Sequence, residues 1–195
     1  MRQVPLSQDT HFIQLVNMEQ TLNNFIVELA AHKGLTIFEL KNKIQSLNDN
    51  QLHSIRGIEA IKEFLGAENM LYLDEYAKNY RMHWKLLNTK NNDVSLQNIE
   101  EGCKQLYAQS YNSVTPTGSS LFSVASNSLI AVNKVDNCGW RFPLCMAAAT
   151  SGAILCHAAC IGGTAGLGTP ACILLCGTLQ AAAGVACIDN YCPIP

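Results

Sequence analysis

Apolar side chains recur at steps of three and four residues between positions 11 and 32 (HFIQLVNMEQTLNNFIVELAAH). The positions that carry this pattern are Phe12, Leu15, Val16, Leu22, Phe25, Ile26 and Leu29. A repeat of this period places the side chains along one face, so the stretch is predicted to be an amphipathic helix. Gly34 follows closely, at a position where glycine commonly ends a helix.

Further helices are predicted along the rest of the first 109 residues. Thr36 and Glu39 have the T-x-x-E spacing of a capping box at the start of a second helix. The later segments predicted to be helical are 37–47, 51–65, 68–87 and 96–108. The alternation typical of a strand is hard to find, so residues 1–109 are predicted to form a small all-helical domain.

Small polar residues dominate the segment that follows this domain. Residues 110–128 (SYNSVTPTGSSLFSVASNS) contain seven Ser and two Thr, together with Pro116 and Gly118. This is the composition of a flexible linker. Residues 110–137 are therefore predicted to be a Ser/Thr-rich linker that a protease cuts, because cleavage concentrates in exposed linkers. Lys134 is one candidate position.

The last part of the chain contains two apolar segments, 144–161 and 171–188, which are rich in Ala and Leu. Both favour helix. The sequence between them, GGTAGLGTP, is typical of a loop, with Pro170 near the start of the second helix. Residues 138–195 are therefore predicted to form a helical hairpin. The whole chain is predicted to be all-α, with a small N-terminal helical domain, a linker and a disulfide-stapled C-terminal hairpin.

Charge and cysteine divide the chain at the same place. Of the 13 Lys and Arg residues and the 15 Asp and Glu residues, only Arg141 and Asp189 lie after residue 137, whereas eight of the nine cysteines lie there. A dense, even set of cysteines in a short segment is typical of a disulfide scaffold made for an oxidising compartment. Residues 1–25 lack the apolar region of a standard secretory leader, so export is expected to use another route. The net charge of −2 argues against nucleic acid as a partner.

The spacing of the cysteines predicts how they pair. From Cys138 onward the intervals between them are nearly palindromic about Gly166. The predicted nested pairs are Cys160 with Cys172, Cys156 with Cys176, Cys145 with Cys187, and Cys138 with Cys192. Residues whose numbers have a constant sum lie opposite each other in an antiparallel hairpin, and the first three pairs meet that condition.

The helical phase of the cysteines agrees with nested pairing. At about 100° per residue, the three cysteines of each apolar segment fall within a stripe about 60° wide. A disulfide needs Cα atoms about 4.4–6.8 Å apart, so small neighbours are expected to let the two helices approach closely. These small residues are Gly152, Ala153, Ala159, Gly177, Ala183 and Gly184. Eight cysteines allow many connectivities, and the sequence alone does not select one.

Three other uses of these cysteines remain open. The residues with metal-binding side chains are Cys156, His157, Cys160, Cys172 and Cys176. Structural zinc sites favour CxxC spacing in polar surroundings, so no metal ligand is predicted, and His157 is expected to be an incidental exposed side chain. A dithiol redox protein usually needs a CxxC motif, which the sequence lacks. Each apolar segment is about long enough to span a membrane, so the third alternative is a transmembrane hairpin in which the cysteines are merely small buried residues.

Conventional catalysis has no visible basis in the sequence. None of the GxSxG, HExxH, Walker or GxGxxG motifs occurs. Asp74 and Glu75 are interpreted as solvated charges on a helix. Cys103 is the odd cysteine and is expected to stay reduced. The chain is therefore predicted to have neither enzymatic activity nor a cofactor.

Residues 138–192, from CGWRFPLC through CHAAC and CILLC to ACIDNYC, resemble bacteriocin precursors of the microhalocin (halocin C-eight-like) type. Members of this family carry a helical N-terminal region ahead of a cysteine-rich, weakly charged C-terminal peptide. The resemblance implies that the C-terminal peptide is released and acts on the membrane of competing cells. It also implies that the N-terminal domain serves as propeptide, escort or self-immunity module.

Together these features predict the precursor of a secreted, disulfide-stabilised, membrane-active antimicrobial peptide that is released from the C-terminus. The expected partners are the target-cell membrane, export machinery and a processing protease, with contact between the N-terminal domain and the C-terminal peptide. The precursor is expected to be cytoplasmic at first. The alternative is an uncleaved membrane-associated or structural protein built on a disulfide hairpin, and processing separates the two.

Overall fold

The computed structural model describes residues 5–49, 55–91, 94–112, 138–163 and 169–192. These ranges contain helices and no strand, which confirms the predicted all-α class. The elements are η1 (Leu6–Gln8), α1 (Thr10–His32), α2 (Ile37–Asp49), α3 (Ile55–Leu65), α4 (Ala67–Lys90), α5 (Leu96–Asn112), α7 (Arg141–Gly163) and α8 (Thr169–Tyr191). The predicted linker, 110–137, begins too early, because residues 110–112 form the end of α5 and Ser110 is buried. The remaining predicted cleavage positions, 113–137, lie outside the described residues.

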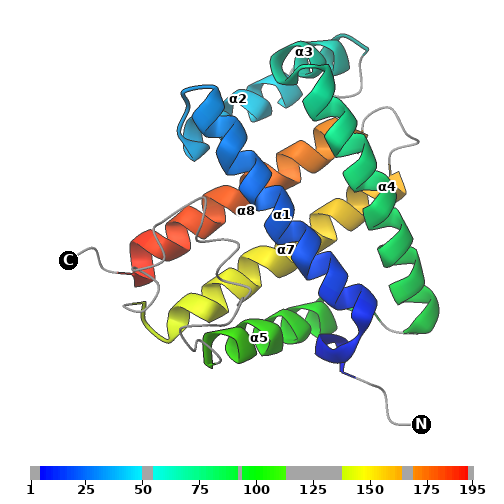
Figure 1. The fold of residues 1–195 in the computed structure, drawn as a ribbon, viewed down its shortest axis with the longest axis vertical. Coiled ribbons are helices and arrows are strands. Elements are labelled where there is room, and N and C mark those ends of the chain that lie inside the picture. Colours follow the sequence, from blue (N-terminus) through cyan, green and yellow to red (C-terminus); the bar gives the residue numbers. More distant parts are fainter. Residues whose placement is uncertain (1–4, 50–54, 92–93, 113–137, 164–168, 193–195) are drawn as a thin grey trace.

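The two C-terminal helices, α7 and α8, lie side by side and antiparallel at the centre of the molecule (Figure 1). Helix α1 crosses both of them, and α5 runs along α7. Helices α2 and α4 pack against α8, and α3 contacts α2 and α4. The predicted hairpin is therefore present, and the N-terminal helices cover much of it.

Local signals set the two ends of α1. The Asp9 side chain accepts hydrogen bonds from the backbone N–H groups of His11 (2.8 Å) and Phe12 (3.3 Å), an N-cap that the hydrophobic pattern does not reveal. At the other end Gly34 has a φ of 65°, and its N–H donates to the Ala31 carbonyl, as in a Schellman motif. The predicted role of Gly34 is confirmed.

The predicted start of α2 is confirmed as well. The Thr36 N–H donates to Glu39 Oε2 (2.8 Å), and the Glu39 N–H donates to Thr36 Oγ1 (3.2 Å), which is the reciprocal pattern of a capping box. The hairpin helices extend somewhat beyond the predicted 144–161 and 171–188 at both ends. Such shifts are expected, because the apolar pattern does not mark the last turn of a helix.

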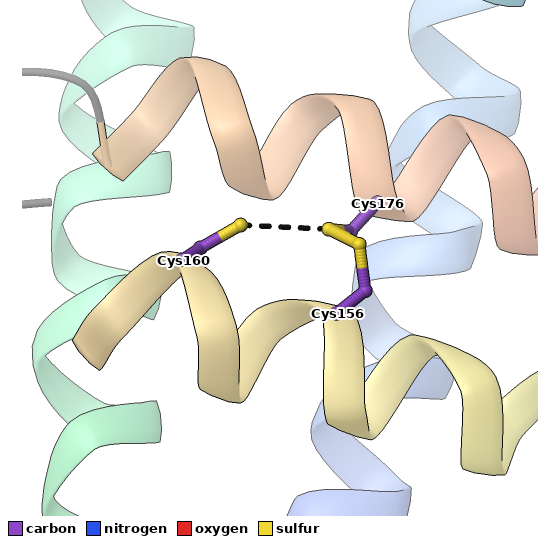
Figure 2. A group of neighbouring side chains, drawn as sticks. All are labelled: Cys156, Cys160 and Cys176. Carbon is purple, nitrogen blue, oxygen red and sulfur yellow. Dashed lines mark hydrogen bonds between the residues drawn. A yellow bond between two sulfur atoms is a disulfide. The ribbon is translucent and has the colours of Figure 1, made fainter. Parts of the chain in front are cut away.

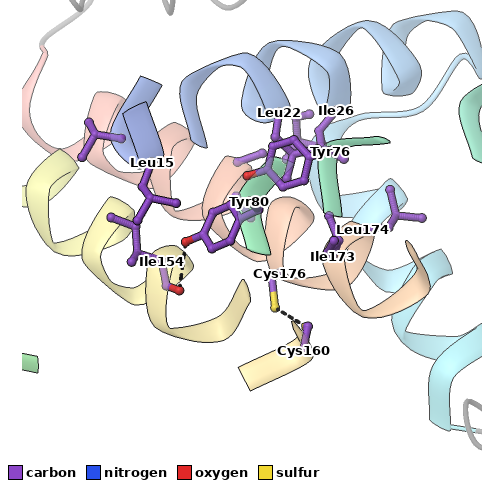
Figure 3. Close-up of a cluster of buried hydrophobic side chains, with 14 of the residues drawn as sticks. Leu15, Leu22, Ile26, Tyr76, Tyr80, Ile154, Cys160, Ile173, Leu174 and Cys176 are labelled. Carbon is purple, nitrogen blue, oxygen red and sulfur yellow. Dashed lines mark hydrogen bonds between the residues drawn. The ribbon is translucent and has the colours of Figure 1, made fainter. Parts of the chain in front are cut away.

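One hydrophobic core joins the N-terminal helices to the hairpin. Fully buried side chains from both parts meet in it (Figure 3). They include Leu15, Leu22 and Ile26 of α1, Tyr80 of α4, Ile154 of α7, and Ile173 and Leu174 of α8. Burial of this apolar surface is the main force that holds the hairpin against the rest of the chain.

The expectation that the small residues of the hairpin all allow its two helices to approach is wrong in part. Gly184 does lie against α7. Gly177 faces α1 instead, because a Cβ built there would lie 3.0 Å from Leu22 Cδ2 and 3.3 Å from Ile26 Cγ1. Gly152 is exposed, with nothing within 4 Å of a Cβ. Part of the glycine pattern thus serves the packing of α8 on the N-terminal helices.

Candidate functional site

Four disulfides link the two helices of the hairpin. They join Cys138 to Cys192, Cys145 to Cys187, Cys156 to Cys176 and Cys160 to Cys172, with Cα–Cα distances of 4.1, 5.8, 5.8 and 5.7 Å. These are the nested pairs that the spacing predicts. The three inner pairs join facing stripes of α7 and α8, and the outermost pair closes the open end just outside the helices.

The two disulfides nearest the hairpin loop touch each other. Figure 2 shows Cys156, Cys160 and Cys176 together, and the Sγ atoms of Cys160 and Cys176 lie 3.5 Å apart. All three Sγ atoms lie within 4.8 Å of one another. Each of them is bonded to a second sulfur, so the oxidised hairpin offers no thiolate here, and thiolate is the form in which cysteine binds a metal.

The prediction that His157 is an exposed, incidental side chain is wrong. The residue is fully buried in α7, and its Nδ1 lies 2.8 Å from Oε1 of Glu19, which is also fully buried. The Nε2 atom lies 3.2 Å from the Ile173 carbonyl oxygen. A carbonyl oxygen only accepts, so Nε2 carries a proton and donates it. His157 therefore connects α1, its own helix α7 and the partner helix α8.

Two tyrosines of α4 surround this histidine. The ring centroids of Tyr76 and Tyr80 lie 5.7 and 5.5 Å from that of His157, both in edge-on orientation. The Tyr80 hydroxyl donates to the Ile154 carbonyl at 3.1 Å (Figure 3). Burial, helped by the nearby carboxylate of Glu19, raises the pKa of Tyr80 well above its ordinary value, so the hydroxyl stays protonated and keeps this bond.

Helix α5 makes a third polar contact with α7. The hydroxyls of Tyr107 and Thr150 lie 2.8 Å apart in a buried hydrogen bond. Burial raises the pKa of Tyr107 above its ordinary value, although its hydrogen bonds to Thr150 and Gln20 oppose that shift. Each of the helices α1, α4 and α5 thus places one polar side chain on α7.

Glu19 is a buried contact residue that was not identified from the sequence, although its position in the helical pattern of α1 predicts burial. It lies three residues after Val16 and three before Leu22, within the apolar stripe of α1. A carboxylate on a buried face needs a partner. That partner is 138 positions away in the sequence. Only Oε1 is paired, since Oε2 has no hydrogen-bond partner among the described residues.

Cys103 is a free cysteine and is fully buried in α5. Burial raises the pKa of this thiol to about 12, and the carboxylates of Glu19 and Glu100 add to the shift. Thiol–disulfide exchange proceeds through the thiolate. The folded N-terminal helices therefore keep the ninth thiol out of exchange at neutral pH.

Both hairpin helices are long and apolar enough to cross a membrane. The segments Arg141–Gly162 and Pro170–Tyr191 meet this test, with 39% and 61% of their windows buried inside the protein. The core helix of a soluble protein passes the same test, and in this structure the hairpin shares a hydrophobic core with the N-terminal helices. Comparison with protein-family models, curated proteins and solved structures found no match.

Proposed function

We propose that the chain is the precursor of a secreted, disulfide-stabilised, membrane-active antimicrobial peptide, in which residues 138–195 are the active part. One observation carries the proposal. The four disulfides all lie within residues 138–192, and among the nine cysteines, each in a described range, none links the hairpin to the N-terminal helices. A cut between residues 113 and 137 leaves the hairpin and its disulfides complete.

The apolar character of the hairpin fits such a role. No Lys, Arg, Asp or Glu occurs between Arg141 and Asp189. In the intact chain, α1, α2, α4 and α5 cover part of its apolar surface. Release exposes the faces that these helices cover, and apolar faces of this kind partition into lipid. The disulfides hold the hairpin together outside the precursor because they restrict its unfolded ensemble.

The N-terminal helices would then act as a cover that holds the peptide while it is inside the producing cell. The contacts from Glu19, Tyr80 and Tyr107 are buried polar contacts, which the membrane environment does not replace. They favour the covered state over membrane insertion. This is the form that a self-protecting precursor requires.

A mass measurement on material from the native host tests the proposal. Secreted protein is collected, and its intact mass is measured before and after reduction and alkylation. We expect a fragment that begins within residues 113–138 and gains two hydrogens for each of four disulfides on reduction. The fragment should then release dye from lipid vesicles and inhibit sensitive cells. A full-length, cell-associated chain contradicts the proposal.

The second candidate is an uncleaved structural or membrane-associated protein. The core shared by the hairpin and the N-terminal helices, together with the buried Glu19–His157 contact, favours this alternative. The same mass measurement distinguishes the two, because the uncleaved protein keeps its full length and shows no secreted fragment.

A further inference from the structure

The three polar contacts from the N-terminal helices fall on one face of α7. They involve Thr150, Ile154 and His157, which are spaced by four and then three residues. At about 100° per residue, these positions span a stripe about 60° wide. The three contacts come from three different helices, so together they fix both the rotation of α7 and its position along its axis.

The face of α7 that carries Thr150, Ile154 and His157, called the contact face here, lies at a fixed angle to the stripe of cysteines on the same helix. Cys145, Cys156 and Cys160 lie about 120° around α7 from the contact face. When the contact face meets α1, α4 and α5, the cysteines point toward α8. A slip of one residue along the axis rotates the helix by about 100° and turns the cysteines away from their partners.

Helix α1 also positions α8. Gly177 leaves room for Leu22 and Ile26 of α1 to pack directly on α8. The Nε2–H of His157 donates to the Ile173 carbonyl, so the residue held by Glu19 also touches the partner helix. Helix α1 therefore contacts both α7 and α8 through side chains other than the disulfides.

We propose that the N-terminal helices are a folding template that selects the nested disulfide pairing while the chain oxidises. In each pair two thiols lose two protons and two electrons to a small-molecule disulfide, which becomes two thiols, and one S–S bond forms in the protein. Four equivalents of this oxidant complete the hairpin. The template function holds whether or not the chain is later cut, and it does not depend on antimicrobial activity.

The contacts select the rotation and register of α7, and one local exchange stays geometrically close even when the hairpin is docked. Cys160 lies 3.5 Å, sulfur to sulfur, from Cys176, which is not its partner. A thiolate at Cys160 can attack Cys176, form the Cys160–Cys176 bond and release Cys156 as a thiolate. Cys103 is a further competitor, and its burial in folded α5 withdraws it. The template can act only on chains in which the N-terminal helices fold before oxidation is complete.

Oxidative refolding of the full-length chain tests the template. Reduced, denatured protein is diluted into a buffer of reduced and oxidised glutathione, quenched with acid, and mapped by proteolysis and mass spectrometry. The test variant combines Glu19→Leu and Tyr80→Phe, which removes two of the contacts. The control combines Glu28→Leu and Tyr72→Phe, the same two changes on the same two helices. Glu28 is exposed, and Tyr72 stacks on Phe25 within the N-terminal helices.

We expect the ratio of nested to other isomers to fall by about tenfold or more in the test variant, since each lost 1.4 kcal/mol is tenfold. The control should match the wild type. Tyr107→Phe keeps the ring and the core, and should give an intermediate ratio even if the double variant does not fold. Equal ratios in the wild type, Tyr107→Phe and the double variant overturn the template. Secretion and killing do not enter this test, so its failure leaves the proposed function intact.

Discussion

At the scale of single residues, Cys103 gives the most direct test of the buried interface. Its side chain is fully buried, and burial raises the pKa of its thiol to about 12. We expect no reaction of the native protein with a thiol reagent at pH 8, and one thiol per chain after unfolding without reductant. Fast labelling of the native protein contradicts the burial. Absence of any thiol after unfolding would show that Cys103 is held in a mixed disulfide.

The Glu19–His157 contact predicts a large loss of stability when one partner is removed. In Glu19→Leu, Nδ1 of His157 stays buried without its partner, which should cost about 2–4 kcal/mol in the free energy of unfolding. Glu28→Leu, an exposed site on the same helix, should change it by less than about 0.5 kcal/mol. Urea titrations measure both.

A double variant shows whether the two residues act together. Glu19→Leu combined with His157→Leu replaces both polar partners by apolar ones, so its cost should be well below the sum of the two single variants. Additive costs would mean that the two side chains do not interact. The Glu19–His157 contact could not be predicted from the sequence. The pattern of α1 places Glu19 on a buried face, but no local rule identifies a partner 138 positions away.

At the scale of helices, the two glycines Gly152 and Gly177 are expected to respond in opposite directions. Gly152 is exposed, so Gly152→Leu should gain up to about 1 kcal/mol from better helix propensity. Gly177→Leu forces a side chain into Leu22 and Ile26 and should cost about 1–3 kcal/mol through overpacking. Thermal unfolding measures both. If the two variants melt alike, α8 does not pack on α1 in the way described.

The start of α1 predicts a dependence on pH. Burial alone would raise the pKa of Asp9, but hydrogen bonds from Lys90, from the backbone of His11 and Phe12, and from Asn91 lower it overall. A lowered pKa means that the contribution of Asp9 to stability is present above its unfolded value of about 4 and is lost as the pH falls through the folded value.

Replacement of Asp9 tests the pH range over which its carboxylate stabilises the protein. Asp9→Ala should cost about 0.5–2 kcal/mol at pH 7, because the N-cap is lost. The difference from wild type should begin to shrink below about pH 4, where Asp9 of the unfolded chain becomes protonated, and the contribution is lost as the pH falls through the lower pKa of the folded state. Glu75→Ala, on an exposed site of α4, is the control and should show no such trend. A constant difference between pH 7 and pH 3 would contradict an ionised cap.

At the scale of the whole molecule, the helices and the disulfide pairs could be predicted from the sequence, but the docking of the hairpin against the N-terminal helices could not. Helix positions follow from local periodicity, and the nested pairs follow from the symmetry of the cysteine spacing about Gly166. The docking of the hairpin into the N-terminal helices depends on contacts between residues far apart in the chain, such as Tyr80 with Ile154. Low charge in residues 138–195 suggested an apolar hairpin suited to a membrane, whereas part of that apolar surface lies in a core shared with the N-terminal helices.

The shared core makes a prediction about cleavage itself. A specific protease site inserted within residues 113–137 allows the oxidised chain to be cut once, without touching the described helices. We expect the two fragments to stay together in gel filtration, because the core and three buried polar contacts join them without any disulfide. Lipid vesicles should then draw the C-terminal fragment away, since they offer an alternative apolar environment.

The outcome separates cutting from release. If the fragments separate on cutting alone, the noncovalent contacts between the N-terminal helices and the hairpin are too weak to hold the two fragments together. If they stay together even with excess vesicles, the uncleaved structural role gains support. Glu19→Leu removes one contact at the interface and should lower the vesicle concentration needed for release, while Glu28→Leu should leave it unchanged. Release that requires both cutting and a membrane is the behaviour that the proposed precursor predicts.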